Sequence, residues 1–360
     1  MKQKRCRLLI VVLAAVFVFT SCNLSHTTQD AKVPEQKKQY QIGLSFDSFV
    51  IERWLRDRDA FVSTANKLGA EVNVQNANGD LQEQISQIEY FIKKKMDVIV
   101  VIAVDCKGLN SVIEKARRSG IKIVSYDRLI KGVDTDLYIS FDNEKVGQEM
   151  AQAMATALPQ GGNIASIMGP ESDNNVLQIK DGFENVLKQT NVTIKYTANC
   201  DKWDADEAPK YTEEAISEVP DLCGIVCGND DIATQVSKTL AEHRLSGKII
   251  IVGQDADLLA CQRIVEGTQT MTVFKQVENM ESIAADFSVE LAKGEDITNK
   301  GVTEGYFATE TIDNDKSQIP YYSLDPIVVT KDNLDSVIID SGFHDRSEVY
   351  LNMQDTATAK

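Results

Sequence analysis

The sequence predicts an α/β protein of two lobes, each a doubly wound parallel sheet with helices on both faces. Short, uninterrupted apolar runs alternate with amphipathic stretches from residue 41 onward, and the same alternation starts again near residue 164. Strands that are apolar throughout are typical of sheets buried on both faces. The chain has 360 residues, which is enough for two domains of ordinary size.

The first run of the pattern predicts four strands with three helices between them. The predicted strands are residues 41–46, 71–75, 98–103 and 121–125. The predicted helices are residues 51–68, 81–94 and 109–118. The second of these helices has the clearest period, because Leu81, Ile85, Ile88 and Ile92 fall on one face.

The second run predicts strands at residues 164–168, 192–197, 224–227, 249–252, 271–274 and, as the last strand, 327–330. Helices are expected between them, beginning with residues 176–188, whose apolar positions share one face. Ligands of such sheets bind outside the carboxyl ends of the strands. Two lobes that face each other would therefore form a cleft lined by both sets of strand ends.

Composition excludes one class of partner. Hydrophobic residues make up 43% of the chain, so it can bury substantial cores, and its composition is not that of an intrinsically disordered protein. The formal net charge is −16, and no basic stripe interrupts it. Such a chain repels phosphate backbones, so we expect no nucleic-acid partner.

Residues 1–21 resemble a bacterial lipoprotein signal peptide. Four basic residues precede an apolar run from Leu8 to Phe19 that is short for a membrane span. Small residues then precede Cys22, which would become the lipid-modified first residue, although Phe19 stands where leucine is usual. A plain secretory signal with an incidental cysteine is the alternative. Residues 22–39 are polar and would form a flexible tether from a membrane lipid to a folded body outside the cytoplasm.

Polar side chains follow several predicted strands at the points where the strands end. They are Asp127, Arg128, Asp173, Asn175, Asn229, Asp255 and Lys275. Carboxylates accept hydrogen bonds, lysine and arginine donate them, and asparagine does both. This set suits a neutral polyol, because each sugar hydroxyl also donates and accepts.

The two tryptophans support the same interpretation. Trp54 follows Glu52 and Arg53, and Trp203 lies within Asp201-Lys202-Trp203-Asp204. A flat aromatic face can cover the C–H face of a sugar ring while nearby charged groups bind its hydroxyls. If the cleft brings the two indoles together, they would hold a monosaccharide between them.

Each of these residues also has an ordinary structural interpretation. Aspartate and asparagine after a strand often cap the next helix, which we favour for Asp142, Asn174 and Asp257. Asp127 and Arg128 could form a structural ion pair, and Trp203 could be a simple core or surface aromatic. Their shared placement at strand ends favours the cleft.

Other classes find little support. The histidines, His26, His243 and His344, show no pairing with a nucleophile, and no phosphate-binding glycine motif follows a strand. A DNA-bound repressor would need a basic helix-turn-helix where the signal segment stands. Residues 76–80 are rich in oxygen ligands but lack the EF-hand glutamate, so we interpret them as a turn. We predict no enzyme activity, no metal and no cofactor.

Five cysteines remain beyond the signal segment and Cys22. They are Cys106, Cys200, Cys223, Cys227 and Cys261. Their spacing matches neither a zinc motif nor a C-x-x-C pair, so we expect buried free thiols, with a disulfide left open.

Longer motifs resemble one family. They are Glu52-Arg53-Trp54, Tyr126-Asp127-Arg128 and residues 138–147, 253–257 and 267–273. From about Gln41 to Phe343 the chain is similar to the D-xylose-binding proteins of bacterial ABC transporters, within the type I periplasmic sugar-binding family. That resemblance implies ten sugar contacts: Arg53, Trp54, Asp127, Arg128, Asp173, Asn175, Trp203, Asn229, Asp255 and Lys275.

The resemblance also implies two lobes joined by three crossovers that close on the sugar like a hinge. The first lobe would comprise residues 40–142 and about 276–325, the second residues 143–275 and about 326–345, with a tail at 346–360. Gln276 stands where the family often has proline, and the loop before Trp203 is shorter. The implied function is to bind D-xylose or a close pentose, as a monomer, and deliver it to a membrane permease. A sugar-sensing co-receptor for a sensor kinase or chemoreceptor is the alternative.

Overall fold

A computed structural model describes residues 39–51, 53–298 and 306–356. Strands and helices alternate along them and form one seven-stranded and one six-stranded sheet. The predicted signal peptide, Cys22, His26 and all of the predicted tether except Gln39 lie outside the described residues, as does Glu52.

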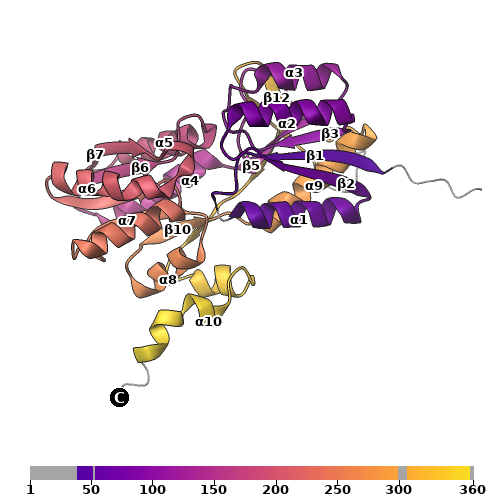
Figure 1. Ribbon diagram of the computed structural model, residues 1–360. Coiled ribbons are helices and arrows are strands. Elements are labelled where there is room, and N and C mark those ends of the chain that lie inside the picture. Colours follow the sequence, from indigo (N-terminus) through magenta and orange to yellow (C-terminus); the bar gives the residue numbers. More distant parts are fainter. Residues whose placement is uncertain (1–38, 52, 299–305, 357–360) are drawn as a thin grey trace, which may run out of the picture. The chain divides into compact units, whose positions relative to one another are not determined.

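The first sheet has the strand order β11-β12-β5-β4-β3-β1-β2. Its strands are β1 (Tyr40–Phe46), β2 (Ala70–Asn76), β3 (Val98–Val101), β4 (Lys122–Tyr126), β5 (Leu137–Phe141), β11 (Glu310–Asp313) and β12 (Gln318–Leu324). Helices α1 (Arg53–Lys67) and α9 (Val277–Lys293) cover one face, and α2 (Leu81–Lys94) and α3 (Asn110–Arg118) cover the other (Figure 1).

The second sheet has the order β13-β10-β9-β8-β6-β7. Its strands are β6 (Gly162–Met168), β7 (Val192–Asn199), β8 (Leu222–Cys227), β9 (Ile250–Gln254), β10 (Met271–Phe274) and β13 (Ile327–Val329). Helices α4 (Asn143–Ala157) and α5 (Asn174–Leu187) pack together on one face. Helices α6 (Ala208–Glu218), α7 (Asp230–Glu242) and α8 (Leu258–Glu266) lie on the other.

These sheets confirm the predicted fold class of two α/β lobes. They differ from the prediction in having antiparallel pairs at their edges and three strands that the sequence pattern did not predict. Both sheets are parallel except at an edge, where β11 pairs antiparallel with β12 and β13 pairs antiparallel with β10. The sequence pattern predicted no strand at β5, β11 or β12. The residues of β11 are mostly exposed at the sheet edge, and β12 contains Pro320 and is mostly half-buried, so neither shows a buried apolar run in the sequence.

The described chain crosses between the sheets three times: after β5, after β10 and after β12. The first and third crossings are tied together. The amide of Asp142 donates to the carbonyl of Leu324 at 3.0 Å, and the Lys145 ammonium lies 2.6 Å from the Asp325 carboxylate. The second crossing runs through Lys275 and Gln276 directly into α9.

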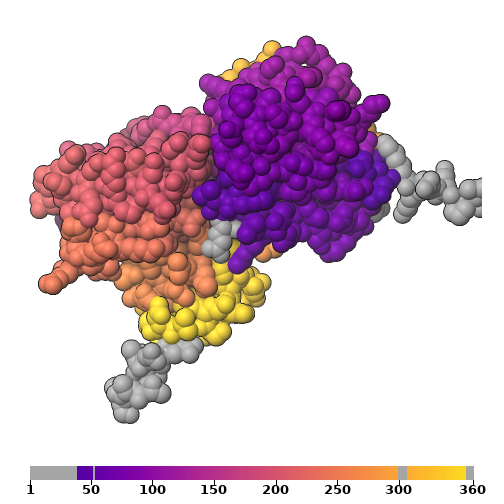
Figure 2. Space-filling view, in the orientation of Figure 1, coloured from indigo at the N-terminus to yellow at the C-terminus, as the bar shows by residue number. Residues whose placement is uncertain are grey.

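The C-terminal residues pack against the second sheet's helices. Helix α10 (Arg346–Val349) contacts α8, and Val349 is buried there with Leu334 and Ile338. Figure 2 shows this segment, in yellow, against the orange surface of residues near 260. Within the described part of the chain, no helix has the length and apolar character needed to cross a bilayer.

Of four predicted local features, two are confirmed, one is wrong and one is confirmed only in its position. Asp142 caps α4 by accepting from the Lys145 amide, and residues 76–80 form a turn whose Asp80 caps α2. Asn174 does not cap α5, because the cap is Asp173, one residue earlier. Asp257 occupies the capping position of α8 but makes no capping hydrogen bond with its side chain.

The five cysteines of the described chain are free thiols, as predicted. Four are buried and Cys223 is half-buried, with its thiol 3.1 Å from the Asn163 carbonyl. Burial raises the pKa of the Cys200 thiol to about 12, so this group stays protonated at neutral pH.

Candidate functional site

A small cavity of about 20 Å³, nearly filled by its own lining, lies where strand ends of both sheets meet. Nine of the ten predicted contact residues line it. The full lining is Ile51, Arg53, Trp54, Asp127, Arg128, Asp173, Asn175, Trp203, Gln254, Asp255 and Lys275. The tenth predicted residue, Asn229, is buried but does not line the cavity.

The parallel sheets explain why these residues meet. Asp127 follows β4, Asp255 follows β9 and Lys275 follows β10, while Asp173 lies between β6 and α5. Carboxyl ends of parallel strands share one edge of a sheet, so each loop delivers its side chain to that edge. Arg53 is the first residue of α1, so it comes from the turn after β1.

The backbone is strained at three of these positions. Asp127, Trp203 and Asp255 have φ angles of 59°, 61° and 98°, in the left-handed region that residues with a Cβ rarely adopt. Such conformations cost about 1–3 kcal/mol each and concentrate at binding and catalytic sites.

Arg53 forms one arm of the site's charge network. Its Nη2 lies 2.6 Å from Asp127 Oδ2, and its Nε donates to Asp57 Oδ2 at 3.1 Å. Asp255, from the second sheet, lies 3.7 Å from Arg53 Nη1 and 3.8 Å from Lys275 Nζ. These distances bring cations within reach of the cavity while carboxylates balance their charge.

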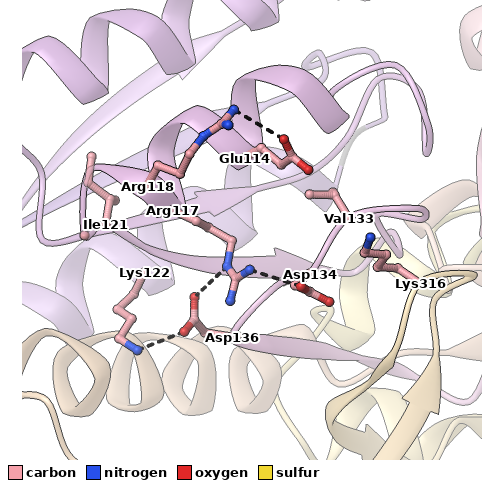
Figure 3. A pocket seen from close by; sticks show the side chains of 10 residues that line it. Glu114, Arg117, Arg118, Ile121, Lys122, Val133, Asp134, Asp136 and Lys316 are labelled. Carbon is pink, nitrogen blue, oxygen red and sulfur yellow. Dashed lines mark hydrogen bonds and ion pairs between the residues drawn. The ribbon is translucent and has the colours of Figure 1, made fainter.

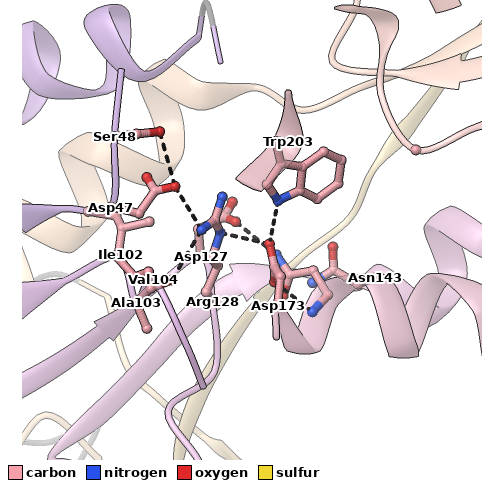
Figure 4. Close-up of polar contacts among 12 residues, drawn as sticks. Asp47, Ser48, Ile102, Ala103, Val104, Asp127, Arg128, Asn143, Asp173 and Trp203 are labelled. Atoms are coloured by element: carbon pink, nitrogen blue, oxygen red, sulfur yellow. Dashed lines mark hydrogen bonds and ion pairs between the residues drawn. The ribbon is translucent and has the colours of Figure 1, made fainter. Parts of the chain in front are cut away.

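Arg128 forms the second arm and bridges the two lobes. Its Nη1 lies 2.9 Å from Asp47 Oδ2, and its Nε lies 2.7 Å from Asp173 Oδ2, as Figure 4 shows. Asn175 Nδ2 donates to Asp127 Oδ1 at 2.8 Å, which adds a second link across the cavity. Arg128 does not form the ion pair with its neighbour Asp127 that the sequence left open. It pairs with Asp47 and Asp173, which are both distant from it in the sequence.

The two indoles reach the cavity from opposite lobes. Trp54 on α1 is 2% exposed, and the Arg53 guanidinium lies 4.4 Å from its ring centre. Trp203 is 5% exposed, and its Nε1 donates to Asp173 Oδ2 at 3.1 Å. The absence of a side chain at Gly169 leaves room for the Trp203 indole, because a Cβ there would lie only 2.5 Å from Trp203 Cε2.

Several buried polar atoms around the cavity have no hydrogen-bond partner among the described residues. Four belong to lining residues: Trp54 Nε1, Asn175 Oδ1, Gln254 Oε1 and Asp255 Oδ1. Two more, Asp47 Oδ1 and Asn229 Nδ2, belong to buried residues that do not line the cavity. A buried polar atom without a partner costs about 1–3 kcal/mol, so native proteins rarely leave several together. A mixture of donors and acceptors in one small cavity indicates a ligand that offers both.

Asn229 and Gln254 differ from what the sequence predicted. Asn229 Oδ1 caps α7 by accepting from the Ile232 amide at 2.9 Å, a role that a position after a strand end also allows. Gln254 is the last residue of β9 and donates to the Gly228 carbonyl at 2.6 Å. Its position directly before Asp255 could have predicted Gln254 as a residue of the site.

Burial and charge act in opposite directions on the site's carboxyl groups. Burial alone would raise the pKa of Asp127, but the charges of Arg53, Lys275 and Arg128 hold this pKa below its usual value. Burial raises the pKa of Asp173 and of Asp47, and Arg128 opposes this rise in both. The site therefore keeps at least one carboxylate, Asp127, firmly ionised as a hydrogen-bond acceptor.

A wider surface hollow lies elsewhere on the first lobe, near the amino end of β4 (Figure 3). Most of its charged side chains pair with one another: Arg117 with Asp134 at 3.4 Å, Lys122 with Asp136 at 2.9 Å and Arg118 with Glu114 at 3.3 Å. It therefore lacks the unpartnered groups of the cavity. In the described ranges, no cluster of three His, Cys, Asp or Glu side chains is arranged for a metal ion.

Comparisons with known proteins identify the family. Residues 42–296 match the family described as periplasmic binding protein domain. The D-xylose-binding periplasmic protein of Haemophilus influenzae is 41% identical over 318 residues, covering 87% of this chain and 93% of that protein. The chain belongs to the periplasmic binding protein family. The resemblance inferred from its motifs is thereby confirmed.

Further relatives agree with this placement. The D-xylose-binding periplasmic protein of Escherichia coli is 39% identical to this binding protein over 322 residues, or 88% of this chain and 94% of that one. A solved carbohydrate transporter solute binding protein from Chloroflexus aurantiacus, in complex with D-glucose, has a TM-score of 0.76 and 25% identity. That similarity covers 86% of this binding protein and 98% of the solved chain.

Proposed function

We propose that this binding protein binds D-xylose, or a close pentose, in the cavity between its lobes and delivers it to an ABC-type sugar permease. The observation that carries the proposal is the cavity itself, which is lined by two indoles from opposite lobes and by buried polar atoms that have no hydrogen-bond partner among the described residues. The 41% identity to a D-xylose-binding periplasmic protein supports the choice of sugar.

The chemistry of the lining fits a pentose. We propose that Trp54 and Trp203 cover the two faces of the pyranose ring. The sugar hydroxyls would form hydrogen bonds with the buried polar atoms that have no partner. Asp127 and Asp255 would accept from hydroxyls, Lys275, Arg53 and Arg128 would donate, and the partnerless Oδ1 of Asn175 would accept. Because a pentose has about ten heavy atoms, micromolar affinity, about −8 kcal/mol, is within reach.

Hinge closure would couple binding to delivery. We propose the lobes stated from the sequence, residues 40–142 with 276–325 and 143–275 with 326–345, as the bodies that move. The three crossings between the sheets support a hinge between them. Sugar contacts from both lobes would stabilise the closed state, and the permease would recognise that state. We further propose a monomer in the periplasm or on the extracytoplasmic face of a bacterial membrane, held by lipid on Cys22.

A sugar panel tests this proposal. The mature chain, freed of co-purified sugar, should show a clear rise in melting temperature with D-xylose and smaller rises with other pentoses and D-glucose. Calorimetry should then give one site per chain. Absence of any shift with every pentose would overturn the proposal, and a larger shift with another sugar would reassign the ligand. Incubation with D-xylose should return the sugar unchanged, since we propose binding without catalysis.

The relatives do not favour the alternative of a sensory co-receptor. The similar proteins of Haemophilus influenzae and Escherichia coli are both named for D-xylose binding in the periplasm. Co-purification from membranes would identify the partner of this chain directly.

A further inference from the structure

Three buried polar side chains lie behind Arg53, and the proposed sugar contacts use none of them. They are Asp57 on α1, Tyr126 at the end of β4 and Glu281 on α9, and each is at most 2% exposed. Buried acidic residues are rare unless they have partners, so a pair of them beside the site calls for a physical role.

The three side chains form a continuous chain of contacts that ends on Arg53. The Tyr126 hydroxyl lies 2.6 Å from Glu281 Oε1 and 3.0 Å from Asp57 Oδ1. The other oxygen of Asp57 accepts from Arg53 Nε at 3.1 Å. Arg53 in turn places its Nη2 2.6 Å from Asp127 and its guanidinium over the ring of Trp54. Glu281 therefore connects to two proposed sugar contacts through Arg53.

The number of hydrogens available for these contacts determines the protonation state of Glu281. A tyrosine hydroxyl has one hydrogen, yet it touches two carboxyl groups at hydrogen-bonding distance. The second contact is satisfied only if one carboxyl group carries a proton of its own. Asp57 forms an ion pair with Arg53, whereas Glu281 forms none among the described residues. The proton therefore belongs on Glu281.

We propose that protonated Glu281 is a positioning residue of the sugar site, which holds Tyr126 and Asp57 so that Asp57 fixes the guanidinium of Arg53 toward the cavity. This inference rests on the proposed sugar-binding function. If Glu281 ionised, a second anion beside Asp57 would compete for Arg53 and draw it away from Asp127 and the sugar.

The surroundings of Glu281 supply no other charge that would alter this assignment within the described residues. Helix α9 packs against α1, β1, β3, β4 and β5. Helix α1 brings Arg53 and Asp57, and β4 brings Tyr126. Strands β1 and β3 carry no charged side chain; Tyr40 begins β1 at the far end of the sheet, and Tyr138 of β5 donates to the Asp127 carbonyl. Burial, the charge of Asp57 and a hydrogen bond with Asp57 raise the pKa of Glu281, and together they outweigh the hydrogen bond with Tyr126 and the charge of Arg53, which lower it.

Two substitutions of Glu281 test whether its side chain acts in the neutral, protonated form. Glu281→Gln keeps the shape and a donor but no charge, so it should bind D-xylose within about twofold of the unsubstituted protein. Glu281→Ala leaves Tyr126 and Asp57 unsupported and should weaken binding about tenfold. Glu278→Gln, which removes an exposed carboxylate from the same helix, is the matched control and should change nothing. A Glu281→Gln protein as weak as Glu281→Ala would overturn the proposal.

The proton itself can be observed without sugar. Carboxyl carbon-13 signals of the full mature chain, assigned by comparison with the Glu281→Gln protein, should show Glu281 protonated at neutral pH. In the unsubstituted protein, any alkaline loss of D-xylose affinity should share the midpoint of that signal and vanish in Glu281→Gln. Glu281 ionised at neutral pH with full affinity would overturn the inference, even if Glu281→Ala failed to fold. Absence of D-xylose binding in the unsubstituted protein would instead sink the proposed function.

Discussion

Removing the Trp203 indole should weaken sugar binding strongly while the fold survives. The side chain is 5% exposed and packs against Gly169 on its own lobe, so only part of its surface can face a sugar. A buried tryptophan covers about 150–250 Å², and we take about half of this, or about 100 Å², as facing the cavity. At about 25 cal/mol per Å², that surface contributes about 2.5 kcal/mol to binding.

This magnitude sets the expected result for Trp203→Ala. A loss of about 2.5 kcal/mol raises the dissociation constant for D-xylose roughly 60-fold. The substitution also removes the donor to Asp173, but Asp173 keeps Arg128 as a partner, so the carboxylate is not left unpaired. Trp203→Phe, which keeps a flat ring without the Nε1 donor, should fall between the two proteins.

Calorimetry with D-xylose on the three proteins provides the measurement, and thermal unfolding without sugar provides the control. If Trp203→Ala unfolds cooperatively and binds within about twofold of the unsubstituted protein, the indole contributes nothing to the site and the reasoning is refuted.

Four further predictions follow from the same geometry. Gly169→Ala should weaken D-xylose binding without touching the sugar, because its Cβ would lie 2.5 Å from the Trp203 ring and displace it; unchanged affinity by calorimetry would contradict this. D-Glucose should bind at least about tenfold more weakly than D-xylose, since its extra hydroxymethyl group must be accommodated in a cavity that is already tight, at about 20 Å³; equal affinities would exclude a pentose-shaped site. The pKa of Asp127 is lowered in the folded protein, so its contribution to the free energy of unfolding is present above about pH 4 and is lost as pH falls through the folded value. The stability difference between the unsubstituted protein and Asp127→Asn should therefore shrink in acid, and a constant difference in denaturant titrations would argue against it. Cys22→Ala should abolish incorporation of radiolabelled fatty acid and release the protein from membranes; retained label would place the lipid elsewhere.

The sequence predicted those parts of the fold that depend on local patterns. Helix α2 and strand β10 have the predicted bounds, because a clear apolar face and a short apolar run determine each of them. Strand β11 was not predicted, since its residues are mostly exposed at a sheet edge and only pairing with β12 defines it. Local pattern cannot reveal a strand that long-range pairing creates.

The candidate site shows the same division. Strand ends and motif resemblance predicted Arg53, Asp127 and Lys275, and the structure brings all three to one cavity. Asn174 was favoured as a helix cap in place of Asp173, because one residue's difference in helix start is invisible without coordinates. Glu281 gave no signal at all: it lies more than two hundred residues from Asp57 along the chain, and only the packing of α9 on α1 brings it near Arg53.

A crystal structure of the mature protein grown with D-xylose tests the central claim most directly. We expect one pentose between the indoles of Trp54 and Trp203, with its hydroxyls bonded to Asp127, Asn175 and Lys275. A sugar bound outside this cavity, or crystals whose cavity stays filled by the protein's own side chains at saturating D-xylose, would contradict the account.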